Sequence, residues 1–452
     1  MHSQLSAQPV LATDGQAARI PLRQPASLRA NALAQGAWYF ARYGAQSIIV
    51  LYLVHALLPR AGAHGSAVLG LATAERWLGL AGAAPSVIAP ALVGITALLD
   101  IPAQIAGGVL GDLCGRRRAA LAGVLLMVIA NLLLCFDRTA LLATLCDMLG
   151  GALAINLFAA LGDLYTADDP RRADAFRITA LAQDVATVLG PLICGGVAAR
   201  FGWHAGFAVA AAILAAGAVC YRLGAGPLPI ASRARMRIDA RDGLRLAALA
   251  LLLPVLALAA LGNEQIYDTY PLWAEQHADL HVAGHLMPPG WLLSLDAAVS
   301  IMMQVAVTAF WRAWARRRTP PGELAQIAAF AWIAPLGPLL LCFASMLHSG
   351  SGAIGFGGLI AFHILNDTAM AVVQPGGMAL FAHESSAAFR GTVMAVYVTS
   401  DRLADGMAGR LGAALPHLGS ADFWLAHAGL IALGALCLTL AARLLHHLFA
   451  GR

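Results

Sequence analysis

Charged residues are scarce in this sequence. They make up 12% of the 452 residues, whereas soluble domains contain about 25%, and apolar residues make up 60%. A soluble fold cannot accommodate this composition, because many of its side chains must remain in contact with water. The composition therefore excludes a soluble enzyme, a disordered chain and a nucleic-acid-binding module. It predicts a protein that crosses a membrane several times.

Lysine is absent, so all 29 basic residues are arginines, and the net charge is +5. Arginines between apolar segments are typical of the cytoplasmic loops of membrane proteins, so this charge does not require a nucleic-acid partner. The seven cysteines form no CxxC pair, and no HExxH motif is present. We therefore expect no disulfide framework, no metal site and no cofactor.

Long apolar runs occur in two sets of six. A spanning helix needs about 20 mostly apolar residues. The expected spans are 33–57, 89–111, 119–136, 140–161, 174–198 and 205–223, followed by 245–272, 289–312, 324–347, 353–381, 391–414 and 422–447. This pattern predicts an all-α polytopic membrane protein with twelve transmembrane helices in two six-helix bundles.

The segments between the spans predict the domain boundaries and the orientation. Residues 1–30 are polar and lack the pattern of a signal peptide, so we expect a disordered cytoplasmic tail. The bundles would comprise residues 31–223 and 244–452, joined by a cytoplasmic linker, 224–243. Arginines concentrate in the linker and in alternate loops, which places both termini in the cytoplasm. The arginine-only basic set favours a bacterial inner membrane.

The loop after the second span combines glycines, an acid and a basic cluster. Its members are Gly108, Asp112, Gly115, Arg116 and Arg117, with Arg118. Glycine permits a tight turn and a close helix approach, and the arginines anchor the loop in the cytoplasm. The pattern resembles the signature loop between helices two and three of the major facilitator superfamily. Leu113 replaces the basic residue that follows the acid there.

A second set of motifs resembles the proton-dependent oligopeptide transporter family. It comprises Gly162-Asp163-Leu164-Tyr165, Asp169-Pro170-Arg171-Arg172, Gly190-Pro191-Leu192, Gly202-Trp203-His204, Glu264-Gln265, Trp291 and Phe389-Arg390-Gly391. The resemblance extends over nearly the whole chain from about residue 33. It implies a monomer that carries short peptides together with protons.

The sequence departs from that family at its charged positions. The two acids and the arginine of the family's first helix correspond to Gln35, Trp38 and Tyr39 here. The family's lysine in span four corresponds to Ala154, and its glutamate in span ten corresponds to Met370. The usual proton-coupling charges are therefore absent, and any coupling must use other residues.

The candidate substrate-binding residues combine one cation, two acids and several polar groups. They are Tyr39, Arg42, Tyr43, Asn156, Asp184, Gln265 and Asp296. Arg42 lies on the same helix face as Tyr39, where a guanidinium group can bind a substrate carboxylate through two hydrogen bonds. Alternatively, Asp184 or Asp296 pairs with it. These two acids occupy peptide-facing asparagine positions of the family, which predicts tolerance for cationic substrates.

Ionisable residues inside a span are costly and are therefore candidates for function. The candidates for proton coupling are Glu264, Asp268, Asp296 and Asp367. Glu264 and Asp268 lie one helical turn apart. When two carboxyl groups are this near each other, one of them tends to take up a proton. The structural alternative is a buried acid–arginine pair that joins two helices. For His363, a structural role is favoured over a proton relay.

These features predict a secondary active transporter that takes up di- or tripeptides, or peptide-like molecules, with protons by alternating access. Its partners would be the substrate, protons and the lipid bilayer. Two alternatives stay open. The lost first-helix acids also fit an exporter of a drug or secondary metabolite, or a non-transporting sensor on a transporter scaffold. No catalytic constellation is evident, so an enzyme is not expected.

Overall fold

Helices dominate the computed structural model, which describes residues 24–64, 68–165, 169, 171–224, 240–348, 353–384 and 390–445. The first half contains α1 (Ala26–Tyr52), η1 (Leu53–Leu57), α2 (Leu58–His64), α3 (Leu71–Leu78), α4 (Pro85–Cys114), α5 (Arg116–Leu133), η2 (Asp137–Thr139), α6 (Ala140–Ala154), α7 (Asn156–Asp163), α8 (Arg172–Phe201) and α9 (Trp203–Gly224). The second half contains α10 (Ala240–Ile266), α11 (Tyr270–His277), β1 (His281–Val282), β2 (His285–Leu286), η3 (Pro289–Trp291), α12 (Leu292–Ala315), α13 (Glu323–Ala331), α14 (Leu336–Leu347), α15 (Phe356–Glu384), α16 (Arg390–Leu418) and α17 (Ser420–Leu444). The two strands form a short antiparallel hairpin.

The all-α membrane architecture expected from the sequence is confirmed. Ten of the described segments are long and apolar enough to cross a membrane. Two helices at expected span positions, α5 and α16, are not among the ten. Three arginines open α5, and α16 contains Asp401, Arg402, Asp405 and Arg410. The count of twelve spans therefore stays a prediction.

The expected domain boundaries differ from the structure at the first helix. α1 begins at Ala26, and the side chain of Leu28 is only 1% exposed, so residues 26–30 are helical and not part of a disordered tail. Residues 1–23 of the expected tail lie outside the described residues. So do residues 225–239, most of the expected linker.

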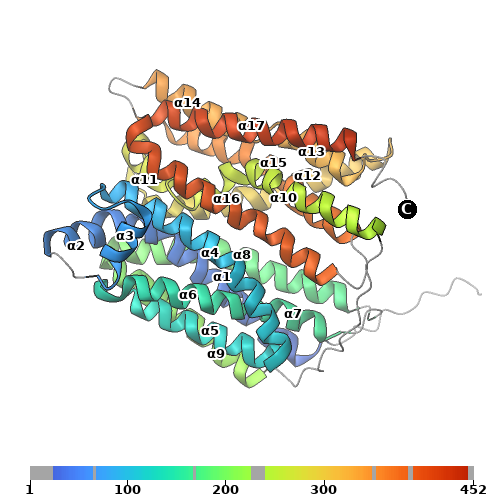
Figure 1. Ribbon diagram of the computed structural model, residues 1–452, viewed down its shortest axis with the longest axis horizontal. Coiled ribbons are helices and arrows are strands. Elements are labelled where there is room, and N and C mark those ends of the chain that lie inside the picture. The colour runs from blue at the N-terminus through green and yellow to red at the C-terminus, as the bar shows by residue number, and fades with distance from the viewer. Residues whose placement is uncertain are drawn as a thin grey trace, which may run out of the picture.

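The two halves of the chain pack side by side in Figure 1, with α1 to α9 in blue to green and α10 to α17 in yellow to red. In the first half, α1 packs on α8 and α9. In the second half, α10 packs on α16 and α17. The largest contacts between the halves are those of α4 with α16 and of α8 with α12. A Cβ atom at Gly94 would lie 2.9 Å from the Cα atom of Gly409, so glycines allow α4 and α16 to cross closely.

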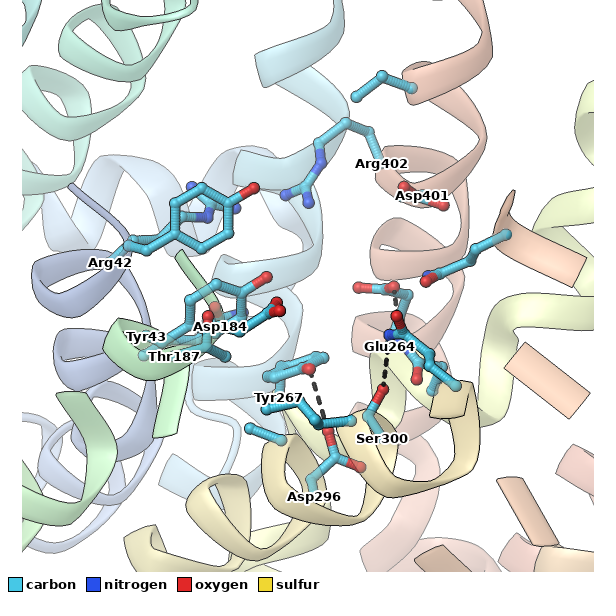
Figure 2. Close-up of a pocket in the computed structure, with 18 of the residues that line it drawn as sticks. Arg42, Tyr43, Asp184, Thr187, Glu264, Tyr267, Asp296, Ser300, Asp401 and Arg402 are labelled. Carbon is cyan, nitrogen blue, oxygen red and sulfur yellow. Dashed lines mark hydrogen bonds between the residues drawn. The ribbon is translucent and has the colours of Figure 1, made fainter. Parts of the chain in front are cut away.

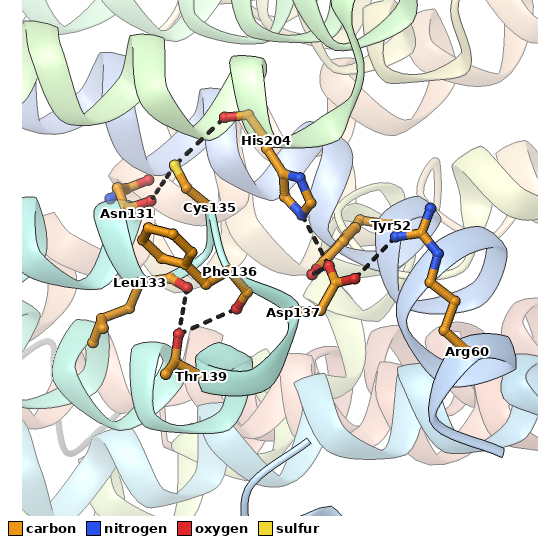
Figure 3. Close-up of polar contacts among 9 residues, drawn as sticks. All are labelled: Tyr52, Arg60, Asn131, Leu133, Cys135, Phe136, Asp137, Thr139 and His204. Atoms are coloured by element: carbon orange, nitrogen blue, oxygen red, sulfur yellow. Dashed lines mark hydrogen bonds and ion pairs between the residues drawn. The ribbon is translucent and has the colours of Figure 1, made fainter. Parts of the chain in front are cut away.

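A carboxylate in η2 ties together one end of the first half (Figure 3). Asp137 accepts hydrogen bonds from the Tyr52 hydroxyl at 2.7 Å and from Arg60 at 2.9 Å, and it contacts His204 Nε2 at 2.9 Å. These partners come from α1, α2 and α9. The Asp137 carboxylate thus connects α1, α2 and α9 at this end of the first half.

Replacing Asp137 by asparagine is expected to lower the free energy of unfolding by roughly 1–3 kcal/mol, because hydrogen bonds to a charged group are lost. Thermal unfolding of the purified protein measures this effect. Asp174→Asn is the control, because Asp174 forms an exposed ion pair with Arg177, and such pairs contribute about 0–1 kcal/mol. Equal unfolding temperatures for the two variants would contradict the role of Asp137.

Candidate functional site

A polar cavity of about 290 Å³ lies between the two halves (Figure 2). The first half contributes α1 and α8 to its walls, and the second half contributes α10, α12, α15 and α16. Six of the residues predicted from the sequence line it: Tyr39, Arg42, Tyr43, Asp184, Glu264 and Asp296. Its volume is at the lower end of the roughly 300–1,000 Å³ of small-molecule pockets. It therefore suits a small, polar ligand.

Arg42 supplies a cation on the first-half wall of the cavity. Its guanidinium group lies 5.7 Å from the centre of the Trp38 ring. Among the described residues, Arg42 forms no ion pair, so neither Asp184 nor Asp296 neutralises it in the way that the structural alternative requires. Beside it, the Tyr39 and Tyr43 rings stack at 5.7 Å. This cation is available to a ligand.

Arg402 faces the cavity from the second half but is already paired. Its guanidinium group lies 2.6 Å from Asp405 and 4.0 Å from Asp100 of α4. It therefore joins α16 to the first half, as the structural alternative describes. Figure 2 shows Arg42 and Arg402 on opposite walls. Of these two arginines, only Arg42 has no carboxylate partner in the part of the chain that the structure describes.

Two acids lie close together where α10 meets α16. Glu264 lines the central cavity, and its carboxyl group lies beside that of Asp405, which lines a neighbouring cavity. Asn263 donates a hydrogen bond to Glu264 at 3.2 Å. Two carboxyl groups so close to each other in a buried place favour a proton on one of them.

A second cluster of polar side chains lies around Asp296, at the cavity wall formed by α12. One oxygen of Asp296 accepts a hydrogen bond from the Tyr267 hydroxyl at 3.1 Å, and the other lies 2.9 Å from His363 Nδ1. Asp367 is buried behind it, close to the Asp296 carboxyl group. One ligand atom from each of Asp296, His363 and Asp367 lies within 4.8 Å of the other two, close enough for a metal ion.

Four residues predicted from the sequence do not line the central cavity. Asn156 donates to the backbone oxygens of Gly107 at 3.1 Å and Leu153 at 2.9 Å, so its amide holds α7 against α4. The Gln265 amide contacts His427 of α17 at 2.9 Å. Asp367 lies behind Asp296. Asp268 lines a neighbouring cavity of about 180 Å³ between α1, α4, α6 and α16, and neither of its oxygens has a hydrogen-bond partner among the described residues.

The loop motif forms a set of contacts at the junction of α4 and α5. Gly115 has a φ of 93°, a conformation that glycine adopts readily, and it ends α4. Arg116 lies 3.2 Å from Asp112 and 2.8 Å from Asp163 of α7, and Arg117 donates to the Arg222 backbone oxygen of α9 at 3.1 Å. Four helix ends are thereby tied together. Nothing in this geometry places the motif at the cavity.

A second loop motif is also internally bonded. Arg171 donates side-chain hydrogen bonds to Asp169 at 3.1 and 2.8 Å, and a backbone one at 2.9 Å. These bonds lower the pKa of the Asp169 carboxyl. This motif therefore shapes the loop between α7 and α8 and does not reach the cavity.

Several cavity residues were missed by the sequence analysis as binding candidates. They are Gln46, Thr187, Asn263, Ser300, Gln304, Gln374 and Tyr397. Uncharged polar residues are common inside transmembrane helices, so only their position between the halves distinguishes them. Asp401 and Arg402 were noticed in the sequence, since both are charged within a span. The sequence did not show that their side chains face the cavity.

Comparison with known proteins identifies the architecture. The sequence model of the Major Facilitator Superfamily matches residues 32–408. The structure is similar to that of peptide transporter POT in complex with sulfate, with a TM-score of 0.79, 19% identity and coverage of 95% of this chain and 96% of that one. It is also similar to a POT family transporter in complex with 5-aminolevulinic acid, with a TM-score of 0.77, 16% identity and coverage of 92% and 96%.

The curated relatives match over shorter segments. A di-/tripeptide transporter of Lactococcus lactis subsp. lactis (strain IL1403) is 32% identical over 178 residues, which is 38% of this chain and 32% of the relative. An uncharacterized transporter, YclF, of Bacillus subtilis (strain 168) is 28% identical over 140 residues, 30% of this chain and 28% of the relative. The matched segments span about a third of the length of these relatives. The superfamily match covers most of the chain, and the chain therefore belongs to the major facilitator superfamily, whose members are transporters and not enzymes.

Proposed function

We propose that this protein takes up di- or tripeptides, or similar zwitterionic molecules, in symport with protons across a bacterial inner membrane. The observation that carries the proposal is the division of charge in the cavity. On the first-half wall, the Arg42 guanidinium group has no carboxylate partner among the described residues, although the acid Asp184 lies on the same wall. The second-half wall carries the acids Glu264, Asp296 and Asp401, together with Arg402, which Asp405 already neutralises. A peptide with a free carboxylate and a free amine complements this arrangement.

Such a ligand connects the two halves. Its carboxylate forms charge-assisted hydrogen bonds with Arg42, and its ammonium group contacts Asp296 of α12 or Asp401 of α16. Contact with both halves is what allows a substrate to stabilise one arrangement of them over another. The resemblance to di-/tripeptide and POT transporters supports the same substrate class.

Contacts between the halves support alternating access. His55 of η1 lies 2.7 Å from Glu275 of α11, and Ser294 of α12 donates to the Val188 backbone oxygen of α8 at 2.7 Å. On the other side, a groove shares Asp184 and Gln304 with the central cavity and follows α12 to Arg316. The structure thus fits a state whose cavity opens toward the arginine-rich loops, which we assign to the cytoplasm together with both termini.

Proton coupling is assigned to the Glu264–Asp405 pair. The two carboxyl groups lie side by side, which favours a proton on one of them. Asp405 also binds Arg402, which contacts Asp100 of α4. Movement of α4 away from α16 takes Asp100 from Arg402 and leaves this cation to the acid pair, which favours release of the proton. We further propose that the protein acts as a monomer.

Counterflow in proteoliposomes tests the substrate class without requiring a proton gradient. Vesicles loaded with unlabelled alanylalanine are expected to accumulate labelled alanylalanine, and external alanylalanine amide and acetyl-alanylalanine are expected to compete at least tenfold less well. Each modified peptide lacks one of the two charges that the cavity complements. Absence of counterflow, or equal competition by all three peptides, would contradict the proposed substrate class.

A further inference from the structure

We propose that Asp296, His363 and Asp367 form a binding site for one divalent transition metal ion, such as Mn²⁺ or Zn²⁺. The site lies between α12 and α15, behind the wall of the central cavity. It shares Asp296 with the acids proposed above to contact the substrate amine, but its test by metal binding does not depend on that proposal. It also differs from the sequence-based expectation that no metal site is present.

The three side chains converge from two helices. His363 and Asp367 are four residues apart on α15, so they lie on one face of that helix. Asp296 reaches them from α12, and one ligand atom of each residue lies within 4.8 Å of the others. The three residues are at most 2% exposed. Two carboxylate oxygens and an imidazole nitrogen are ligands that Mn²⁺, Fe²⁺ and Zn²⁺ accept.

Neighbouring groups hold the opposite atom of each ligand. The Tyr270 hydroxyl contacts His363 Nε2 at 3.1 Å, which leaves Nδ1 toward Asp296. Such contacts orient metal ligands and fix the tautomer of a ligating histidine. Tyr267 donates to Asp296 Oδ2 in the same way.

Asp367 completes the arrangement. Asn366 donates to its Oδ1 atom at 3.2 Å, and its Oδ2 atom is buried with no hydrogen-bond partner among the described residues. A buried carboxylate oxygen without a donor is costly. Each of the three ligands therefore has one atom held from outside and one atom available to an ion.

The charge of the cluster also calls for a cation. Two acids lie together with a single histidine, and among the described residues neither acid pairs with an arginine. A divalent ion bound to two carboxylates and a neutral imidazole gives a neutral site. Since Asp296 also lines the central cavity, an ion can reach the site from there, and three protein ligands leave positions for water.

Metal binding to the full-length protein in nanodiscs, with any affinity tag removed, tests this proposal. After chelator treatment, calorimetric titration with Mn²⁺ or Zn²⁺ is expected to show one site per chain. Asp367→Asn and His363→Gln are expected to weaken it at least tenfold, and Tyr270→Phe to weaken it less. His383→Gln is the matched control, because His383 is exposed on the same helix, and it is expected to bind as the wild type does.

The electron paramagnetic resonance spectrum of bound Mn²⁺ provides a second readout that misfolding does not imitate. Nitrogen coupling is expected in the wild type and in Asp367→Asn at saturating metal, and its loss is expected in His363→Gln. No binding to the wild type, or binding that the Asp367 and His363 variants leave unchanged, would overturn the proposal. The cluster would then be a set of hydrogen-bonded acids that holds protons instead of a metal ion.

Discussion

Arg42→Ala is expected to weaken binding of alanylalanine about 10- to 100-fold, because a hydrogen bond to a charged group contributes roughly 1.5–3 kcal/mol. Arg42 is the arginine in the cavity without a carboxylate partner among the described residues, so its loss removes a ligand contact and leaves the contacts between helices intact. Arg42→Lys keeps the charge but loses the two-pronged geometry, and we expect an intermediate affinity. Binding to purified protein by calorimetry measures both variants.

The dipeptide amide shows whether Arg42 acts on the carboxylate. If it does, the wild type and Arg42→Ala bind alanylalanine amide with similar, weak affinity, because the amide lacks the carboxylate that Arg42 binds. Arg29→Ala is the matched control, because Arg29 is exposed at the start of the same helix. If Arg42→Ala weakened the amide as much as the free peptide, a direct contact with the carboxylate would be ruled out.

Glu264→Gln is expected to abolish accumulation of peptide driven by an inward proton gradient, while counterflow persists. Glutamine keeps the size and the hydrogen bonds of a protonated glutamate but cannot release the proton. We expect uptake with the gradient to fall at least tenfold, to the level seen without it. Uptake and counterflow of the same labelled dipeptide in proteoliposomes separate the two steps.

Glu323→Gln controls for a general effect of removing an acid from the second half, because Glu323 begins α13, away from the cavity lining. Asp405→Asn, in the same acid pair, is expected to lose gradient-driven uptake as well. Persistence of full gradient-driven uptake in Glu264→Gln would remove this pair from the coupling mechanism.

The all-α membrane fold followed from the composition and from the lengths of the apolar runs. Apolar runs of span length and the arginine-rich loops located nearly every helix, because the bilayer imposes a fixed length on each apolar segment. The first helix was placed too late, since residues 26–30 are only mildly apolar although Leu28 packs inside. Spans were also predicted at α5 and α16, but their charges leave both helices outside the ten segments that are apolar enough to cross a membrane.

The site was only partly predictable, because sequence spacing says which residues share a helix face but not which helix lies opposite. Arg42 and Glu264 were found as charges within spans, and both line the cavity. Asn156 was also placed at the site, yet a close approach of α4 at Gly111 directs its amide into a helix contact. The meeting of Asp296 with His363, 67 residues apart, depends on the packing of α12 against α15.

Uptake of a labelled dipeptide into proteoliposomes, with an inward proton gradient and then without one, tests the central claim most directly. The division of charge across the cavity and the close approach of Glu264 to Asp405 predict accumulation above the external concentration only when the gradient is present. Equal uptake under both conditions would contradict proton coupling. No uptake under either condition would contradict peptide import itself and favour an exporter or another substrate.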